Sequence, residues 1–307
     1  MVRTHTAHIR FYNRDAIDAG RWDAFVKKSS QYRIYALSTW LDHLAPNWGA
    51  LINEDYSVVM PLTAKKKYGI RYLAQPRFTQ QLGFYTQHPE VMEAGELFLQ
   101  QAMHLYAFGD VWLNTPVESV SCFERKNYVL PLQASYAEIH RRYSKSLVHN
   151  SLKPALKQQF IYDAELDIIN AINAYQQGYQ QRMQLVNRDY IPLRNLAEVL
   201  SPSGNCFTRT VKDEKGALLA ISLFFCDHQR IYNLCSATTL SGRKRNANYF
   251  LYDQLIREFS GSGLILDFEG SSIPGIEAFY KKFGAVPEPY YSVKWNRLRW
   301  PLKIFKK

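Results

Sequence analysis

The sequence predicts a mixed α/β protein built from two halves of similar size. The chain has 307 residues, and a length of about 150 residues per domain favours two domains. Short apolar segments bounded by turn residues alternate with longer amphipathic segments along the chain. In the second half, helical segments stand between strand segments, and helices that cross between strands predict a sheet with mixed pairing.

The first half begins with helical segments and continues with strands. We expect a helix over residues 21–29 and a second short helix that Ser38 caps. A strand over 58–62 is expected to end at its proline, followed by a basic turn over 65–69 and a strand that starts at Ile70. The remaining expected elements are a helix over 89–106 and strands over 110–113 and 127–132.

The joint between the halves is expected near residues 132–135. This gives an N-terminal domain over 1–133 and a C-terminal domain over 134–307. The second domain should open with a long helix from Tyr136 to about Gln159. Its basic side chains are Arg141, Arg142, Lys145, His149, Lys153 and Lys157.

The rest of the second half has a clear order of elements. A helix over 167–184 precedes a meander of three strands, over 206–211, 217–226 and 231–236. The middle strand is almost wholly apolar, so we expect it to be central and buried on both faces. The chain then continues with a loop over 242–248, a helix over 249–259, a strand over 263–268, a helix over 274–283 and a strand over 290–295.

The composition indicates a core-forming protein with a basic excess. Apolar and aromatic residues make up 47% of the chain, and 38 Lys and Arg against 27 Asp and Glu give a formal net charge of +11. This charge favours a phosphate-rich cofactor, a nucleic acid or an acidic membrane surface as partner, or serves solubility alone. The longest apolar run, over 217–225, is far shorter than the roughly 20 residues that span a bilayer.

The cysteines and the N-terminus indicate a reducing cytoplasm. No signal peptide is visible between Met1 and Tyr12. No CxxC pair and no zinc-ligand spacing is present, so we expect buried free thiols. The cysteines are Cys122, Cys206, Cys226 and Cys235.

The loop over 242–248 carries the strongest binding signal. It lies between a strand and the start of a helix, where free backbone amides and the helix dipole attract phosphate. Gly242 would allow the backbone to turn. The alternative is a solvated basic turn. The candidate ligands for the anion are Arg243, Lys244, Arg245, Asn246, Ala247 and Asn248.

Two carboxylates and one tyrosine are the candidate catalytic residues. Asp267 and Glu269 are two positions apart at a strand end, so both side chains should face the same side, where one could accept a proton from an amine. The alternative is a structural turn. Tyr280 could donate a proton to a leaving group, or pack in the core beside Phe279 and Phe283.

Several other site types lack support in the sequence. The eight histidines are scattered and form no HExxH motif, and no GxSxG, Walker A or GxGxxG motif is present. No metal site is therefore expected. The segment over 295–307 mixes aromatic and basic residues, which suits contact with an anionic membrane or RNA, or simply a final strand with a solvated end.

The second half resembles the acyl-CoA N-acyltransferase (GNAT) fold, and more narrowly its FemAB-like branch with two such domains in tandem. The matching segments are 206–236, 242–259, Leu266–Asp267–Phe268–Glu269–Gly270–Ser271 and 279–285; weaker matches are Trp22–Asp23, 60–62 and 80–83. The resemblance implies two tandem GNAT-like domains, of which the first is degenerate. It also implies that residues 243–248 hold the donor's phosphates, and that a backbone amide near Leu234, Cys235 and Ser236 polarises a carbonyl.

The resemblance implies transfer of an acyl or aminoacyl group to a small-molecule or peptide amine. Our leading hypothesis is an N-acyltransferase with acyl-CoA as cosubstrate and no bound cofactor. Asn246 and Asn248 replace small residues of the GNAT phosphate loop, which counts against coenzyme A. The alternatives are an aminoacyl-tRNA-dependent transferase acting on a cell-wall precursor and a non-catalytic binding module. Tyr280 stands where peptidoglycan-building relatives often carry Lys, which counts against tRNA.

Overall fold

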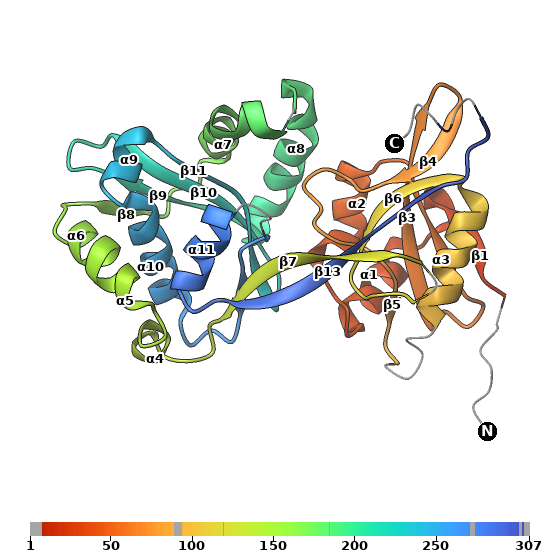
Figure 1. Cartoon of the computed structure of the whole chain (residues 1–307), viewed down its shortest axis with the longest axis horizontal. Coiled ribbons are helices and arrows are strands. Elements are labelled where there is room, and N and C mark those ends of the chain that lie inside the picture. The colour runs from red at the N-terminus through yellow and green to blue at the C-terminus, as the bar shows by residue number, and fades with distance from the viewer. Residues whose placement is uncertain are drawn as a thin grey trace. The chain divides into compact units, whose positions relative to one another are not determined.

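The computed structural model describes residues 8–88, 94–118, 120–183, 185–270, 274–300 and 303. By its contacts the chain divides into unit 1, Met1–Arg125 with Pro289–Lys307, and unit 2, Lys126–Glu288. The division falls within β7 (Cys122–Pro131) and β13 (Val286–Asn296), each of which runs from one unit into the other (Figure 1). It therefore differs from the expected joint at 133/134. The reason is strand pairing, because β7 pairs with a strand of unit 2 and β13 pairs with a strand of unit 1.

Unit 1 is a sheet with helices packed on it. The sheet order is β1–β2–β3–β4–β6–β13, and β5 pairs with β3. Its elements are β1 (Arg10–Asn13), η1 (Arg14–Ala16), α1 (Ala19–Lys28), η2 (Ile34–Ala36), α2 (Ser38–Leu44), β2 (Trp48–Ile52), β3 (Val58–Lys67), β4 (Ile70–Ala74), β5 (Tyr85–Thr86), α3 (Ala94–Leu105) and β6 (Phe108–Leu113). Buried Trp22 and Trp48 meet at 5.1 Å between ring centroids in its core.

Two sequence predictions for unit 1 were wrong. The strand over 58–62 does not end at Pro61. Pro61 lies opposite Ala50 of β2 within the ladder, and β3 continues to Lys67. Only Tyr68 and Gly69 form the turn. Ser38 does not cap α2; its hydroxyl donates to Asp23 at 2.8 Å. The helix expected over 89–106 is α3 from Ala94, and residues 89–93 lie outside the described ranges.

Unit 2 contains a mixed sheet in the order β7–β12–β11–β10–β9–β8. The expected meander is confirmed, since β9–β10 and β10–β11 pair antiparallel, and β11 then pairs parallel with β12. The elements are α4 (Tyr136–His140), α5 (Lys145–Leu147), η4 (Val148–Leu152), α6 (Lys153–Ala155), β8 (Ile161–Asp163), α7 (Ile168–Met183), η5 (Asn187–Asp189), α8 (Ile191–Leu200), η6 (Ser201–Ser203), β9 (Cys206–Lys212), β10 (Leu218–Cys226), β11 (Arg230–Thr238), α9 (Leu240–Lys244), α10 (Ala247–Phe259), β12 (Ile265–Asp267) and α11 (Pro274–Lys282).

The long basic helix expected over 136–159 is broken after His140. Ser144 is the reason: its hydroxyl accepts from the amide of Leu147 at 3.1 Å and so starts a new helical run. The amide of Ser144 donates to the carbonyl of Lys282 at 2.8 Å, which ties the break to α11. A tertiary contact of this kind leaves no periodic signal in the sequence.

The predicted fold class, a mixed α/β sheet protein, is confirmed. In unit 2, α10 and α11 pack on the sheet through buried residues such as Leu255, Phe268 and Phe283. All four cysteines are free thiols, with Cys206 and Cys235 buried and Cys122 and Cys226 only half-buried. Among the helices described, none has the length and apolar character needed to cross a membrane. The described residues also hold no cluster of three or more potential metal ligands.

Candidate functional site

Unit 2 contains an open cavity of about 610 Å³. Strands β10 and β11 form one wall, and residues from α7, α9, α10 and α11 form the others. Its volume lies within the roughly 300–1,000 Å³ typical of small-molecule sites. Most of the lining is apolar or hydroxyl-bearing, and Arg243 is the one charged side chain among the described lining residues.

The cavity lies beside the part of β11 that extends past its pairing with β12. These strands pair only over Arg230–Ile265, Ile231–Leu266 and Tyr232–Asp267. Beyond Tyr232, β11 continues to Thr238, and none of the described strands pairs with it on the β12 side. The last residues of β11, from Ser236 to Thr238, line the cavity along this open edge.

The open edge offers backbone amides to a ligand. The amide of Thr239 donates to the carbonyl of Leu219 on β10 at 2.9 Å. Because successive amides of a strand point to opposite sides, those of Ser236 and Thr238 face away from β10, toward the opening. Ser236 is one of the residues that the sequence predicted here. Leu234 is half-buried and Cys235 is fully buried, and neither residue lines the cavity. Burial raises the pKa of the Cys235 thiol.

A group of hydroxyls lies against this part of β11. The hydroxyls of Ser222 and Ser236 share a hydrogen bond of 2.7 Å across β10 and β11. Tyr252 of α10 donates to Ser236 at 3.1 Å, and both residues line the cavity. Sequence reasoning missed Tyr252, and also Tyr249, whose hydroxyl accepts from Lys282 at 3.2 Å. The only sequence feature that indicated this group of hydroxyls was Ser222, the single polar residue within an otherwise apolar strand.

The loop expected over 242–248 is mostly helical. Thr239 caps α9, its hydroxyl accepting from the amide of Gly242 at 3.0 Å. Gly242 is required by close packing rather than by a turn, because a Cβ atom there would lie 2.2 Å from the carbonyl oxygen of Leu219. Asn246, at φ 61°, is the left-handed residue that separates α9 from α10.

The three cations of this segment do not act together. Arg243 lines the cavity, and its Nε donates to the carbonyl of Thr238 at 3.2 Å. Lys244 is exposed and does not line it. Arg245 contacts Gln158 at 3.1 Å and Asp213 at 3.6 Å, outside the cavity lining. Among the amides and small residues, Asn248 lines the cavity, Ala247 is buried at the start of α10 and Asn246 is half-buried.

The candidate catalytic residues are separated by the structure. Tyr280 of α11 lines the cavity, and its ring stacks on Phe268 at 4.4 Å between centroids. Asp267 is fully buried outside the cavity lining, and Glu269 lies outside it too. The regular strand alternation behind the expected common direction ends at Asp267, the last residue of β12, and Glu269 has a left-handed backbone with φ 62°. Ser271 lies outside the described residues.

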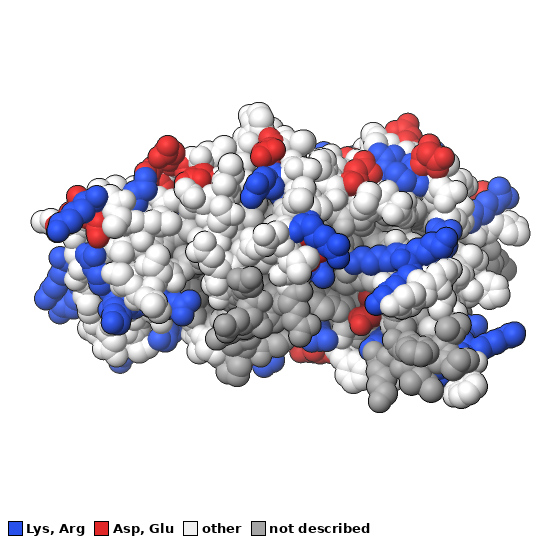
Figure 2. Space-filling model, turned by 90° about the horizontal axis from the view of Figure 1, so that it is seen from above, with Lys and Arg blue, Asp and Glu red and all other residues white. Residues whose placement is uncertain are grey.

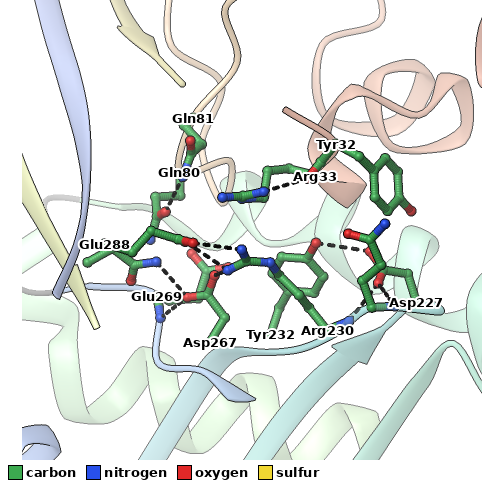
Figure 3. Close-up of polar contacts among 12 residues, drawn as sticks. Tyr32, Arg33, Gln80, Gln81, Asp227, Arg230, Tyr232, Asp267, Glu269 and Glu288 are labelled. Carbon is green, nitrogen blue, oxygen red and sulfur yellow. Dashed lines mark hydrogen bonds and ion pairs between the residues drawn. The ribbon is translucent and has the colours of Figure 1, made fainter. Parts of the chain in front are cut away.

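Asp267 belongs instead to an ionic cluster with Arg230 and Glu288 (Figure 3). Arg230 donates to Asp267 at 3.1 Å and to both carboxylate oxygens of Glu288 at 2.8 and 2.7 Å. Asp267 also accepts from the side-chain amide of Asn127 and from the backbone amide of Glu269, both at 2.9 Å. Burial, opposed by the attraction of Arg230, raises the pKa of Asp267. These contacts pair Asp267 with Arg230 and Asn127 in the interior of unit 2.

The sequence matches no family model and no curated protein. Solved structures match the fold. FemX gives a TM-score of 0.67 at 14% identity, covering 94% of this chain and 98% of that chain. The C-terminal domain of a putative lysylphosphatidylglycerol synthetase from Agrobacterium fabrum gives 0.57 at 11% identity, covering 94% of each chain. The structure of L-PGS from Bacillus licheniformis gives 0.52 at 11% identity, covering 94% of this chain and 95% of that chain.

These likenesses establish the fold. The chain shares its mixed α/β architecture with FemX and with the lysylphosphatidylglycerol synthetase domain. The predicted resemblance is confirmed as a likeness of fold to FemX. Because one fold serves many activities, the chemistry has to be argued from the cavity itself.

Proposed function

We propose that this chain transfers an acyl group from a thioester donor to an amine, and that the reaction takes place in the cavity of unit 2. The separation of β11 from β12 carries this proposal. It leaves the amides of Ser236 and Thr238 at the edge of a cavity that is large enough for a donor and an acceptor. A carbonyl placed there would be polarised by amides that are already fixed in position.

The proposed reaction passes through a tetrahedral intermediate. The lone pair of the amine attacks the carbonyl carbon, and the oxyanion of the tetrahedral intermediate accepts hydrogen bonds from the β11 amides. Collapse of the intermediate forms the amide bond and breaks the carbon–sulfur bond. One proton leaves the nitrogen and one reaches the departing thiolate. Tyr280, which lines the cavity, is the proposed donor to the sulfur.

Positioning carries most of the proposed catalysis. No Asp, Glu or His occurs among the described residues that line the cavity. A proton from the amine would therefore pass to water or through the hydroxyls of Tyr252 and Ser236, which are 3.1 Å apart. Holding an amine and an activated carbonyl together converts a bimolecular reaction into an effectively unimolecular one, which can supply much of the rate enhancement.

Acyl-CoA is the proposed donor, with Arg243 at the cavity as the ligand for its phosphates. The test is thermal unfolding with and without coenzyme A. Saturating coenzyme A should raise the melting temperature, since a ligand at roughly 100 times its Kd stabilises by about 2.7 kcal/mol. Arg243→Ala should abolish the rise. Lys244→Ala, which removes the neighbouring exposed cation outside the cavity, should retain it.

Other results would contradict the proposed donor or the proposed reaction. No shift with saturating coenzyme A, or equal loss in Arg243→Ala and Lys244→Ala, would exclude this donor site. A shift without any product from a panel of amines would indicate a binding module that has the fold without the chemistry.

One observation favours aminoacyl-tRNA as an alternative donor. Lys145, His149, Lys153 and Lys157 are exposed on the α5–α6 segment of unit 2. Such a surface suits a phosphate backbone. If tRNA binds there, affinity should fall steeply with salt, and Lys153→Glu with Lys157→Glu should flatten the slope. A salt-independent affinity would exclude this donor.

A further inference from the structure

One end of unit 1 gathers cations that the proposed reaction does not use. Lys65, Lys66 and Lys67 end β3, and Arg71 follows the turn on β4; all four side chains are exposed. The segment after β13 adds two more exposed cations, Arg297 and Arg299. We call these six residues the basic end of unit 1.

Strand register brings the two groups together. Lys66 lies opposite Arg71 in the β3–β4 hairpin. Strand β6 lies between β4 and β13, with Leu73 opposite Gly109 on one side and Asn296 opposite Phe108 on the other. The amide of Arg297 donates to the carbonyl of Ala107 at 2.7 Å, so the strand order places Arg297 at the same end of the sheet as Arg71.

The basic end also presents two large aromatic side chains to solvent. Tyr68 at the tip of the hairpin is 87% exposed, and Trp300 is 80% exposed. Tyr68 is held at the tip by a left-handed backbone, with φ 51°. The ammonium of Lys67 lies 5.2 Å from the centroid of the Tyr68 ring. Tyr and Trp are enriched at interfaces where one end of the side chain is in an apolar and the other in a wet environment.

No acidic side chain neutralises the basic end within the described residues, since none of their ion pairs involves Lys65, Lys66, Lys67, Arg71, Arg297 or Arg299. A cavity of about 340 Å³ opens beside the hairpin and is lined by the three lysines together with Asn47, Thr63 and Tyr72. Its described lining contains no Asp or Glu. The cavity can hold a phosphate-bearing headgroup among the lysines.

We propose that the basic end of unit 1 binds the surface of a bilayer that contains anionic phospholipids. Lysines and arginines would meet the lipid phosphates, while Tyr68 and Trp300 would enter the headgroup layer, where amphipathic aromatic rings are most stable. The β3–β4 hairpin extends from the rest of unit 1 (Figure 1), and Figure 2, which views the molecule from that side, shows Lys and Arg side chains over this part of the face. The inference goes beyond the proposed transfer reaction and does not depend on it.

The test is cosedimentation of the full chain with vesicles. Vesicles of phosphatidylcholine with phosphatidylglycerol should bind it, vesicles of phosphatidylcholine alone should not, and salt should weaken the binding. The variant K65Q/K66Q/K67Q should lower the apparent affinity on the order of 100-fold, since each basic residue near an anionic surface contributes about 5-fold. The control variant makes the same change in net charge on the exposed α5–α6 segment of unit 2, at Lys145, Lys153 and Lys157. It should retain binding.

Trp300 provides a second readout that does not depend on charge. It is the exposed member of the six tryptophans, because Trp22, Trp40, Trp48 and Trp295 are buried and Trp112 is half-buried. Brominated phospholipid should therefore quench part of the fluorescence of the bound protein, and Trp300→Phe should remove that part. Both variants change exposed side chains, so an unchanged melting temperature would show that the fold is intact.

Three results would overturn the proposal. These are failure to bind anionic vesicles, equal loss of binding in the control variant, and binding without quenching of Trp300. A fourth would reassign the surface to nucleic acid: competition by a single-stranded RNA that binds more tightly than the vesicles and is sensitive to the same three lysines.

Discussion

Tyr280 lines the cavity, and its ring lies in the core of unit 2. The ring stacks on Phe268 and packs edge-on against Phe279 at 5.8 Å between centroids. Removing the hydroxyl should therefore leave the packing intact. We expect Tyr280→Phe to lower kcat about 100-fold, in line with the loss of a general acid, while the KM for the donor stays unchanged.

Tyr162→Phe is the matched control for this prediction. The Tyr162 hydroxyl donates to Glu258 at 2.7 Å and lies outside the cavity lining. Its loss should not alter turnover. Steady-state kinetics of both variants with one acyl donor and one amine tests the role of the Tyr280 hydroxyl. Equal turnover in the wild type and in Tyr280→Phe would return Tyr280 to a packing role.

Arg230 presents a different case, because one of its two carboxylate partners is fully buried. Asp267 is fully buried and Glu288 is partly exposed. Removing Arg230 leaves the Asp267 carboxylate without its counter-charge. We expect Arg230→Met to lower the free energy of unfolding by about 3–5 kcal/mol, as when one partner of a buried ion pair is removed. Urea unfolding with an unchanged m-value would measure this.

Lys126→Met serves as the control for Arg230→Met. Lys126 is more than half exposed and its ammonium lies 3.5 Å from Glu277. A surface pair of this kind contributes at most about 1 kcal/mol. If Arg230→Met costs no more than Lys126→Met, the ionic cluster does not stabilise unit 2.

At the scale of elements, α11 carries Tyr280 and is held to β7 by one carboxylate. Glu277 accepts from the hydroxyl of Tyr128 at 2.7 Å and from Lys281 at 2.5 Å. The hydrogen bonds from Lys281 and Tyr128 lower the pKa of Glu277 to about 2. A carboxylate with a lowered pKa stabilises the fold above its unfolded pKa, and this stabilisation is lost as the pH falls toward the folded pKa.

Acid should therefore weaken the attachment of α11. As the pH falls from about 4.5 to about 2, the wild type should lose stability relative to Glu277→Gln, whose side chain does not titrate. Thermal unfolding of both proteins across this range is the measurement. Parallel pH profiles would show that Glu277 makes no contribution of this kind.

The sequence predicted long elements with a strong hydrophobic pattern well. It predicted poorly the short elements and the helix break that depends on a tertiary contact. The meander β9–β10–β11 was predicted because its middle strand is almost wholly apolar between clear turns. Strand β8 and helix α8 were missed. The break after His140 was missed as well, since it depends on a contact between Ser144 and Lys282, 138 positions apart by their numbers (282 − 144).

For the site, some of the candidates predicted from the sequence lie together at one cavity and others do not. It placed Ser236, Arg243, Asn248 and Tyr280 among the candidates, and these four line the cavity. Asp267 was proposed as catalytic because a carboxylate at a strand end resembles a general base. Its partner Arg230 comes from the neighbouring strand, and the sequence gives no sign that the two are paired. Residues that reach a site from different elements are found only through the fold.

At the scale of the whole molecule, the pairing of β7 predicts which pieces of the chain can fold. Strand β12 has β11 on one side and β7 on the other, with Leu266 opposite Leu130 and Asp267 opposite Val129. Strand β7 also supplies buried Tyr128 to the core of unit 2, and Asn127 to Asp267. A piece that starts after β7 should therefore be unstable, although it contains every cavity residue.

Three fragments test this directly. Residues 126–288 and 126–307 keep the β7 segment of unit 2, whereas residues 134–307 lack it and correspond to the joint that the sequence suggests. We expect cooperative urea unfolding for the first two and none for the third, because losing buried Leu130 and Leu132 alone removes two large side chains, each worth about 2–5 kcal/mol in a core. Comparing 126–288 with 126–307 isolates the effect of the chain after Glu288. Cooperative unfolding of 134–307 would show that β7 is dispensable and that the contact-based division of the chain does not describe its folding units.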